Sequence, residues 1–345
     1  MKRRDSYLTI GAVGLGAVLA YSYLTKKKNI YDLTGKIVLI TGGSRGLGLN
    51  ISRQLLRMGA RVVICARDIN ELEGAVLELS GPGNKVMAIQ CDTTDKLQVD
   101  KMITMIRDRW GSVDVLINNA GIIQVGPFEN MTTADFENAM KTHFWAPLYT
   151  TIAVLEDMKN KNNGRIVNIS SIGGKVAIPH LLPYTASKFA LNGLSQGLRS
   201  ELKKHNIIVT TISPGLMRTG SIHNITLKGQ HKKEYAGFSI LSAMPLLTVS
   251  ASHAAARIIK AVQFGEASVT ISLPAKILAS FYKKFPGLTT DIFSLINQIL
   301  PGATESSHGK TSEESYSTIS PSVTTVLADK AAGENNEILK ESQYP

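Results

Sequence analysis

The feature that most constrains the fold is a glycine-rich loop between two apolar segments. Residues 41–48 read Thr-Gly-Gly-Ser-Arg-Gly-Leu-Gly; they follow the apolar run Ile37–Thr41 and precede an amphipathic stretch at 49–58. This pattern predicts a buried strand, a tight turn and a helix. Glycines placed there let the backbone approach a pyrophosphate, whose charge the helix N-terminus stabilises. The loop therefore predicts a dinucleotide-binding α/β unit.

Strands and helices alternate along much of the remaining chain. Apolar, β-branched runs predict six more strands, at 61–66, 85–90, 113–117, 165–170, 207–213 and 268–272. Helical patterns fill most intervals, and one helix is expected from Ala251 to Phe264. This alternation predicts a single α/β domain at about 35–275, with a Rossmann-type, doubly wound parallel sheet that binds ligands at the strand C-termini.

Two arginines lie where the sugar of the dinucleotide is expected. Arg67 follows the second strand, at the point where an NAD site usually has an acidic residue for the ribose 2′-hydroxyl, and Arg45 lies in the glycine loop. Two cations favour a 2′-phosphate, and so NADPH/NADP, unless both are ordinary solvent-facing arginines. Asp92, after the third strand, is expected either to accept from the adenine amino group or to cap a helix, whereas Asp68 is expected to cap the next helix.

A tyrosine and a lysine one helical turn apart are the candidate catalytic pair. Tyr184 and Lys188 follow Ser171, which ends a β-rich run. A phenol normally titrates near ~10, and an ammonium one turn away favours the phenolate and lowers the pKa. These groups suit protonation of a carbonyl oxygen while hydride reaches its carbon. A solvated lysine beside a half-buried tyrosine is the alternative interpretation.

Taken together, these motifs resemble the classical short-chain dehydrogenase/reductase family. The resemblance covers about 35–275 and rests on Thr41–Gly48, Asn118-Asn-Ala-Gly121, Ser171, Tyr184-x-x-x-Lys188 and Pro214-Gly215, in this order and spacing. It implies that Tyr184 is the general acid/base, that Lys188 binds the nicotinamide ribose and lowers the pKa of Tyr184, and that Ser171 orients the carbonyl. Ser170 competes for the serine role, but the family spacing favours Ser171. With the residues above, the expected cofactor contacts are Thr41, Gly42, Ser44, Arg45, Gly46, Leu47, Gly48, Arg67, Asp92, Asn118, Ala120, Gly121, Tyr184, Lys188, Pro214, Gly215 and Thr219.

The sequence departs from the family at one catalytic position. His143 stands where the family usually has an asparagine, at a helix distortion whose backbone carbonyl holds a relay water. Pro147 lies four residues later and has no N–H, so the carbonyl of His143 loses its helical partner. We therefore expect one long helix, at about 133–160, with a free carbonyl at His143. A simple kink with a packed histidine is the alternative.

The N-terminus is expected to anchor the protein in a membrane. Residues 8–24 are uncharged and mostly apolar, at the short limit for a bilayer span, and basic triplets flank them. Much of the net charge of +11 belongs to these triplets, which favours a membrane surface over nucleic acid. A cleaved signal peptide and a twin-arginine export signal are alternatives. A cytosolic cofactor places the catalytic domain on the cytoplasmic side.

The C-terminal third is expected to contain the segments that surround the substrate. Residues 216–248 correspond to the family's mobile substrate loop. Segments 277–285 and 292–300 combine apolar residues with lysines, and are expected to cover the substrate mouth and rest on a bilayer, or simply to pack. From Ala303 the composition predicts a disordered tail. The expected divisions are thus 1–34 anchor and tether, 35–275 catalytic domain, 276–302 apolar extension and 303–345 tail.

The resulting hypothesis is a membrane-tethered, NADPH-dependent carbonyl reductase, or alcohol dehydrogenase in reverse. The anchor and the apolar extension favour a small lipophilic substrate such as a keto-lipid, retinoid or steroid; the motifs resemble both hydroxysteroid dehydrogenases and bacterial keto-acyl reductases. The alternative is a membrane scaffold or sensor that binds NADPH without turnover. The two cysteines fall in expected strands, which indicates a reducing compartment, and no residue cluster has metal-ligand spacing. A homo-oligomer is compatible with the family.

Overall fold

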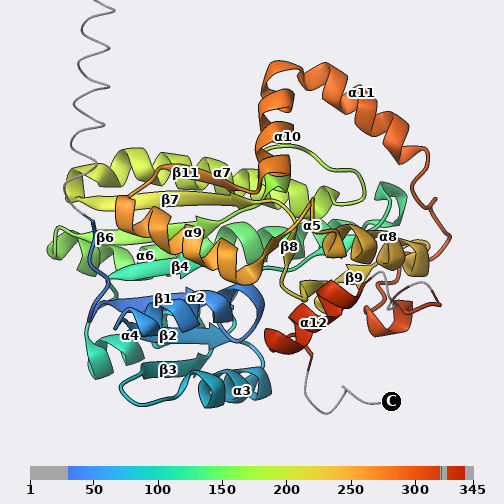
Figure 1. Cartoon of the computed structure of the whole chain (residues 1–345). Coiled ribbons are helices and arrows are strands. Elements are labelled where there is room, and N and C mark those ends of the chain that lie inside the picture. Colours follow the sequence, from blue (N-terminus) through green and yellow to red (C-terminus); the bar gives the residue numbers. More distant parts are fainter. Residues whose placement is uncertain (1–29, 319, 321–324, 339–345) are drawn as a thin grey trace, which may run out of the picture.

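Seven parallel strands form the centre of the molecule (Figure 1). The computed structural model describes residues 30–318, 320 and 325–338. The strand order is β11-β7-β6-β4-β1-β2-β3. The strands are β1 Ile37–Thr41, β2 Arg61–Ala66, β3 Lys85–Gln90, β4 Val115–Asn118, β6 Gly164–Ile169, β7 Ile207–Pro214 and β11 Ser268–Ile271. β1 pairs with β2 on one side and β4 on the other, so the chain order reverses at β1, where such sheets bind ligands.

Helices cover both faces of this sheet. One face carries α2 (Gly46–Arg57), α3 (Ile69–Leu79) and α9 (Ala251–Phe264), and the other carries α4 (Lys96–Trp110), α6 (Ala146–Asn160) and α7 (Leu182–Leu202). Strand residues alternate between the two cores: Val38 and Ile40 face the first, and Leu39 faces the second. Both faces are buried, which is why the strands are continuous apolar runs. The predicted Rossmann-type α/β architecture is confirmed.

A distorted helix leads into the second layer. The predicted helix at 133–160 is divided into α5 (Thr133–Met140), a π-helical turn (Lys141–Trp145) and α6. The N–H of Ala146 donates to the carbonyl of Lys141, five residues back, which is the π pattern. The distortion therefore surrounds His143, as expected, and Pro147 lies in the first turn of α6.

Shorter elements lie beyond the carboxyl ends of the strands. The expected substrate loop at 216–248 contains a helix, α8 (His231–Ala243). Two small parallel pairs accompany it: β5 (Gln124–Val125) with β9 (Thr226–Leu227), and β8 (Met217–Arg218) with β10 (Val249–Ser250). Single 3₁₀ turns occupy Phe128–Asn130, Ile172–Gly174, Lys203–His205, Ser221–Asn224 and Glu313–Ser315.

The expected apolar extension is a helical arm that projects from the body (Figure 1). It consists of α10 (Leu273–Lys284) and α11 (Pro286–Asn297). Leu278, Tyr282 and Phe293 pack against Val176 and its neighbours, in the chain segment that follows β6. The arm is therefore joined to the chain segment that begins just after Ser171.

The prediction of a disordered tail is wrong for the described part of residues 303–345. Lys310 pairs with Leu227, and α12 (Val326–Glu334) packs close to α8. Ala328, Ala331 and Ala332 are buried, so this largely polar segment still presents a small apolar face to the rest of the protein. Composition alone does not detect such a face.

The proposed anchor at residues 8–24 lies outside the described residues. Among residues 30–318, 320 and 325–338, no helix has the length and apolar character needed to cross a membrane.

Candidate active site

The glycine loop and the end of β4 close against each other. Gly42 has φ +61°, and a Cβ there would lie 2.9 Å from the Cα of Ala120. Asn119 fixes the loop because its Nδ2 donates to the carbonyls of Thr41 and Gly42, at 3.1 and 2.9 Å. The Thr41 hydroxyl in turn accepts from the N–H groups of Asn119 and Ala120. A backbone this close and this well bonded holds the loop in the shape that lets the N-terminus of α2 bind a phosphate group.

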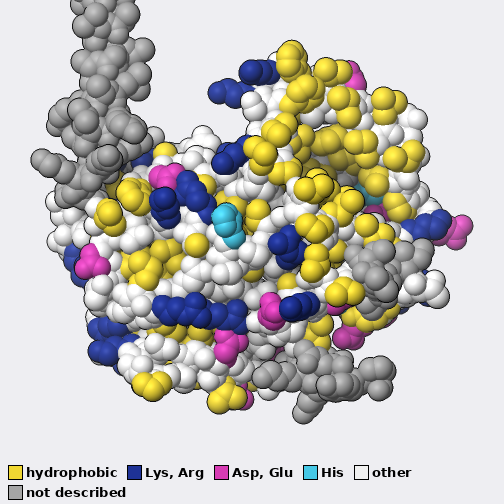
Figure 2. Space-filling view, in the orientation of Figure 1, with side chains coloured by type: hydrophobic (Ala, Val, Ile, Leu, Met, Phe, Trp, Pro, Cys, Tyr) yellow, Lys and Arg dark blue, Asp and Glu magenta, His cyan; other side chains and the backbone are white. Residues whose placement is uncertain are grey.

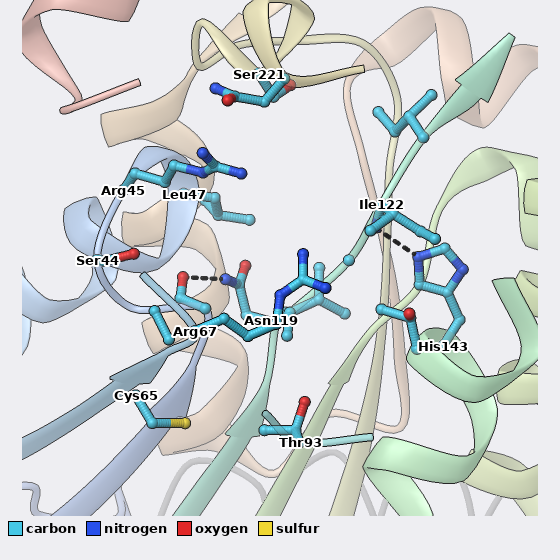
Figure 3. A pocket seen from close by; sticks show the side chains of 18 of the residues that line it. Ser44, Arg45, Leu47, Cys65, Arg67, Thr93, Asn119, Ile122, His143 and Ser221 are labelled. Carbon is cyan, nitrogen blue, oxygen red and sulfur yellow. Dashed lines mark hydrogen bonds between the residues drawn. The ribbon is translucent and has the colours of Figure 1, made fainter. Parts of the chain in front are cut away.

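Two arginines reach into the pocket beside this loop, as Figure 3 shows. Arg67 follows β2 and lines the pocket. Arg45 contacts α3, because its Nη1 donates to Glu71 at 2.6 Å. The Ser44 hydroxyl donates to the same carboxylate at 2.8 Å. Both predicted arginines therefore line the pocket, but Arg45 is paired with Glu71, which was not predicted.

Tyr184 and Lys188 lie at the other end of the pocket, and Ser171 lies beside the phenol. Tyr184 and Lys188 lie one turn apart on α7 and line the pocket, and Lys188 Nζ donates to the carbonyl of Ile169 at 2.9 Å. The Ser171 hydroxyl hydrogen-bonds the phenol of Tyr184 and accepts from the N–H of Gly173 at 3.0 Å. The hydroxyl of Ser170 instead donates to the carbonyl of Lys188, at 3.2 Å. Of the two candidate serines, Ser171 is therefore the one beside the phenol.

Burial controls the protonation of this pair. It raises the pKa of Tyr184, and the hydrogen bond from Ser171 offsets this rise only in part. Burial also lowers the pKa of Lys188 to about 7. The lysine Nζ lies 5.5 Å from the centre of the Tyr184 ring. The pKa of Tyr184 is therefore raised and not lowered as expected, because desolvation of the phenol is the largest influence on it.

His143 connects the cofactor side of the pocket to the catalytic helix. Its Nε2 accepts from the N–H of Ile122 at 3.1 Å (Figure 3), so Nδ1 carries the proton and donates to Ser187 Oγ at 2.7 Å. Ser187 then donates to the carbonyl of Tyr184, also at 2.7 Å. Burial, together with the charge of Lys188, lowers the pKa of His143 well below its ordinary value, which keeps the ring neutral. The side chain is therefore fixed between the loop after β4 and α7.

Other predicted residues fall into two groups. Those that line the pocket are Gly42, Ser44, Arg45, Leu47, Arg67, Asp92, Ala120, Gly121, His143, Tyr184, Lys188 and Thr219. Those that support it from behind or beside are Thr41, Gly46, Gly48, Asn118, Ser171, Pro214 and Gly215.

Asn118 and Asp92 illustrate the difference between the two groups. The Nδ2 of Asn118 donates to Asn168 at 2.9 Å and its Oδ1 accepts from Thr150 at 2.7 Å, so this buried side chain ties β4 to β6. Asp92 lines the pocket and accepts from Thr94, whereas Asp95 caps α4. The capping alternative for Asp92 is therefore wrong, and contact with an adenine remains a prediction.

Several residues that line the pocket were not predicted from the sequence. Asn119, Glu71, Asn224 and Glu337 all line the pocket. Asn119 lies in the motif Asn118-Asn-Ala-Gly121, so its polar side chain at a strand end was a usable signal. Glu337 comes from the far end of the chain, and nothing local indicates its position.

Comparison with known proteins decides the family. The family model described as short chain dehydrogenase matches residues 36–229, which is more than half of the chain. The chain belongs to the short-chain dehydrogenase/reductase family. It is therefore an oxidoreductase that acts on carbonyl or alcohol groups and binds NAD or NADP.

Two named relatives and one crystal structure are similar to this chain. The chain is 35% identical over 233 residues to dehydrogenase/reductase SDR family member 7B of Danio rerio, across 64% of this chain and 74% of that one. It is 34% identical over 191 residues to gluconate 5-dehydrogenase of Gluconobacter oxydans, across 55% and 75%. The crystal structure of a short-chain dehydrogenase from Streptomyces avermitilis matches with a TM-score of 0.65 and 28% identity, over 76% of this chain and 98% of that one.

Proposed function

We propose that the protein is an NADPH-dependent carbonyl reductase, or alcohol dehydrogenase in reverse, in which Tyr184 is the general acid/base. The observation that carries the proposal is the contact between the Tyr184 phenol and the Ser171 hydroxyl, with Lys188 in the same pocket. Three polar groups this close together suit a carbonyl oxygen that gains negative charge in the transition state.

The raised pKa of Tyr184 supports the reductive direction. A phenol whose pKa lies above its ordinary value stays protonated at neutral pH and can donate its proton to a developing alkoxide. Ser171 donates to the same oxygen and polarises it, and Lys188 holds its position through Ile169. The nicotinamide of the bound cofactor supplies the hydride. Tyr184 then regains its proton from solvent through the polar groups around Lys188.

The two arginines support NADPH over NADH. Arg67 lies at the end of β2, where a ribose phosphate is expected, and is not joined to a carboxylate by a described ion pair. Arg45 shares its charge with Glu71. Guanidinium groups bind phosphate through paired, charge-assisted hydrogen bonds, so Arg67 carries most of this preference.

The helical arm supports a lipophilic substrate at a membrane surface. Figure 2 shows apolar side chains along α10 and α11 and along the hollow beneath them. The exposed apolar residues of this arm are Leu273, Ile277, Phe285, Leu288, Ile292, Leu295 and Ile296. Lys276, Lys283 and Lys284 accompany them. An apolar surface with lysines suits an anionic bilayer, and the apolar run at 8–24 would hold the chain there.

The test is cofactor oxidation by the full chain, reconstituted in lipid vesicles. NADPH and NADH are each compared against ketones and aldehydes of increasing apolar length. The proposal predicts turnover with NADPH that increases with apolar length. Equal turnover with NADH would contradict the cofactor assignment, and a preference for short polar substrates would contradict the substrate class. Tight NADPH binding without turnover on any carbonyl would favour the scaffold or sensor.

A further inference from the structure

The C-terminal segment after α12 lies on the glycine loop of the cofactor site. We call residues 335–337 the C-terminal hook. The N–H of Gly46, at the start of α2, donates to the carbonyl of Asn335 at 2.8 Å. The Nδ2 of Asn50, one turn further along α2, donates to the side-chain oxygen of Asn335 at 2.6 Å. The hook therefore uses a backbone donor at the helix N-terminus, where the family binds the cofactor phosphates.

Each residue of the hook is bonded to the walls of the cofactor site. The Nδ2 of Asn335 donates to the carbonyl of Thr219 at 3.1 Å, which joins the glycine loop to another expected cofactor contact. Asn336 donates to the carbonyls of Ser44 and Glu71, at 3.0 and 3.1 Å. These contacts span both sides of the pocket, so the hook crosses it.

The third residue of the hook brings a carboxylate to the anion site. The Oε2 of Glu337 lies 3.4 Å from the Nε of Arg45 and accepts from Asn224 at 2.8 Å. A Cβ added to Gly46 would collide with the other oxygen of Glu337, which shows how closely this carboxylate approaches the loop backbone. Burial raises the pKa of Glu337 to about 7, against the opposing influence of Arg45. The side chain is thus buried in the site, with 4% of its surface exposed.

The geometry points to an autoinhibitory role for the hook: it occupies the pyrophosphate subsite, and NADP(H) must displace it to bind. The Glu337 carboxylate and a cofactor pyrophosphate cannot both lie against the backbone of Gly46. The inference rests on the family's use of NAD(P), and not on the proposed substrate or on the preference for NADPH. α12 then serves as a tether that keeps the hook near the site when it is released.

Measurements of cofactor affinity, which require no turnover, test this inference. One variant ends at Gly333 and lacks the hook; its control ends at Ile338 and keeps the hook. A third, full-length variant is Glu337→Ala. Dissociation constants for NADPH and NADH are measured by calorimetry, and folding is checked by thermal melting. If the hook occupies the site in about nine molecules of ten, its removal should tighten binding about tenfold. The control variant should match the full chain.

Two further measurements separate a plug from a cofactor lid. A peptide of residues 325–345 should compete with NADPH for the chain that ends at Gly333. In the full chain, saturating NADPH should speed amide hydrogen exchange in 326–337, because the displaced segment loses its contacts. Weaker binding after truncation, or slower exchange with NADPH, would overturn the inference and make the hook a lid. If the truncated chain fails to fold, Glu337→Ala and the exchange data decide alone.

Discussion

At the scale of single residues, the balance of charges beside the glycine loop sets cofactor choice. Arg67 and Arg45 favour a phosphate, whereas Glu71 bonds both Ser44 and Arg45 and opposes one. A sequence pattern that counts only the arginines overstates the positive charge there. The described contacts place Glu71 where it moderates the proposed preference for NADPH.

This balance predicts opposite effects for two variants. Arg67→Ala should raise the KM for NADPH about tenfold or more, the equivalent of about 1.4 kcal/mol, and leave the KM for NADH nearly unchanged. Glu71→Gln should lower the KM for NADPH several-fold, because it removes one of the two carboxylates that contact the Arg45 guanidinium. Steady-state kinetics with both cofactors measure the two effects.

Glu73→Gln is the matched control, since Glu73 is also on α3 but outside the pocket lining. If Arg67→Ala weakened NADPH and NADH equally, Arg67 would serve the loop structure and not the 2′-phosphate.

At the scale of elements, the π-helical turn shows how a proline reshapes an active site. Pro147 has no N–H for the carbonyl of His143, and the chain takes a π turn at 141–145 instead of continuing a regular helix. The same turn brings the His143 ring to Ile122 and Ser187. The backbone distortion and the side-chain contacts at this position are therefore distinct features.

The separation predicts different costs for two substitutions. Pro147→Ala restores an N–H that can bond the carbonyl of His143, so it should lower kcat at least tenfold if that carbonyl serves the proton relay. His143→Asn keeps an oxygen that can accept from the N–H of Ile122, so its effect should be smaller. Turnover of the two variants under saturating cofactor gives the comparison.

A larger loss in His143→Asn than in Pro147→Ala would contradict this assignment. It would place the function in the imidazole and its bond to Ser187. Thermal melting of both variants separates these effects from unfolding.

Elements with strong local patterns were predicted well. The strand bounds at 37–41, 61–66 and 85–90 agree with the structure, because buried parallel strands are uninterrupted apolar runs. The region at 216–248 and the tail were not predicted, since α8 and α12 have mixed composition and are ordered by contacts with distant segments. Tertiary packing, and not local propensity, decides such helices.

The candidate site was predicted to a similar degree. Tyr184, Lys188 and Ser171 follow a fixed local spacing, so the sequence identifies them. Glu337 reaches the pocket from nearly 300 positions beyond Gly46 through the fold of the whole chain. No local rule connects two residues at that separation.

At the scale of the whole molecule, the buried amine of Lys188 reduces stability near neutral pH. The pKa of Lys188 falls from its ordinary 10.5 to about 7 because of burial. Between these values the unfolded chain keeps a proton that the folded chain releases, so the free energy of unfolding rises with pH. Below about pH 7 both states are protonated, and the folded state bears the cost of the buried charge.

Lys188→Met should remove this dependence. From about pH 7 to about pH 9, the free energy of unfolding of the unmodified chain should rise by on the order of 2 to 3 kcal/mol relative to the variant. Urea denaturation of both proteins at the two pH values gives the difference, and other titrating groups cancel in the comparison. Parallel pH profiles would mean that Lys188 is charged in the folded state.

The most direct test of the central claim is Tyr184→Phe, assayed for NADPH binding and for reduction of an apolar ketone. The account predicts that the variant binds NADPH with the affinity of the unmodified chain, because the ring and its packing remain. Its kcat should fall on the order of 100- to 10,000-fold, the usual worth of a positioned general acid. A variant that kept its kcat would contradict the assignment of Tyr184 as the proton donor.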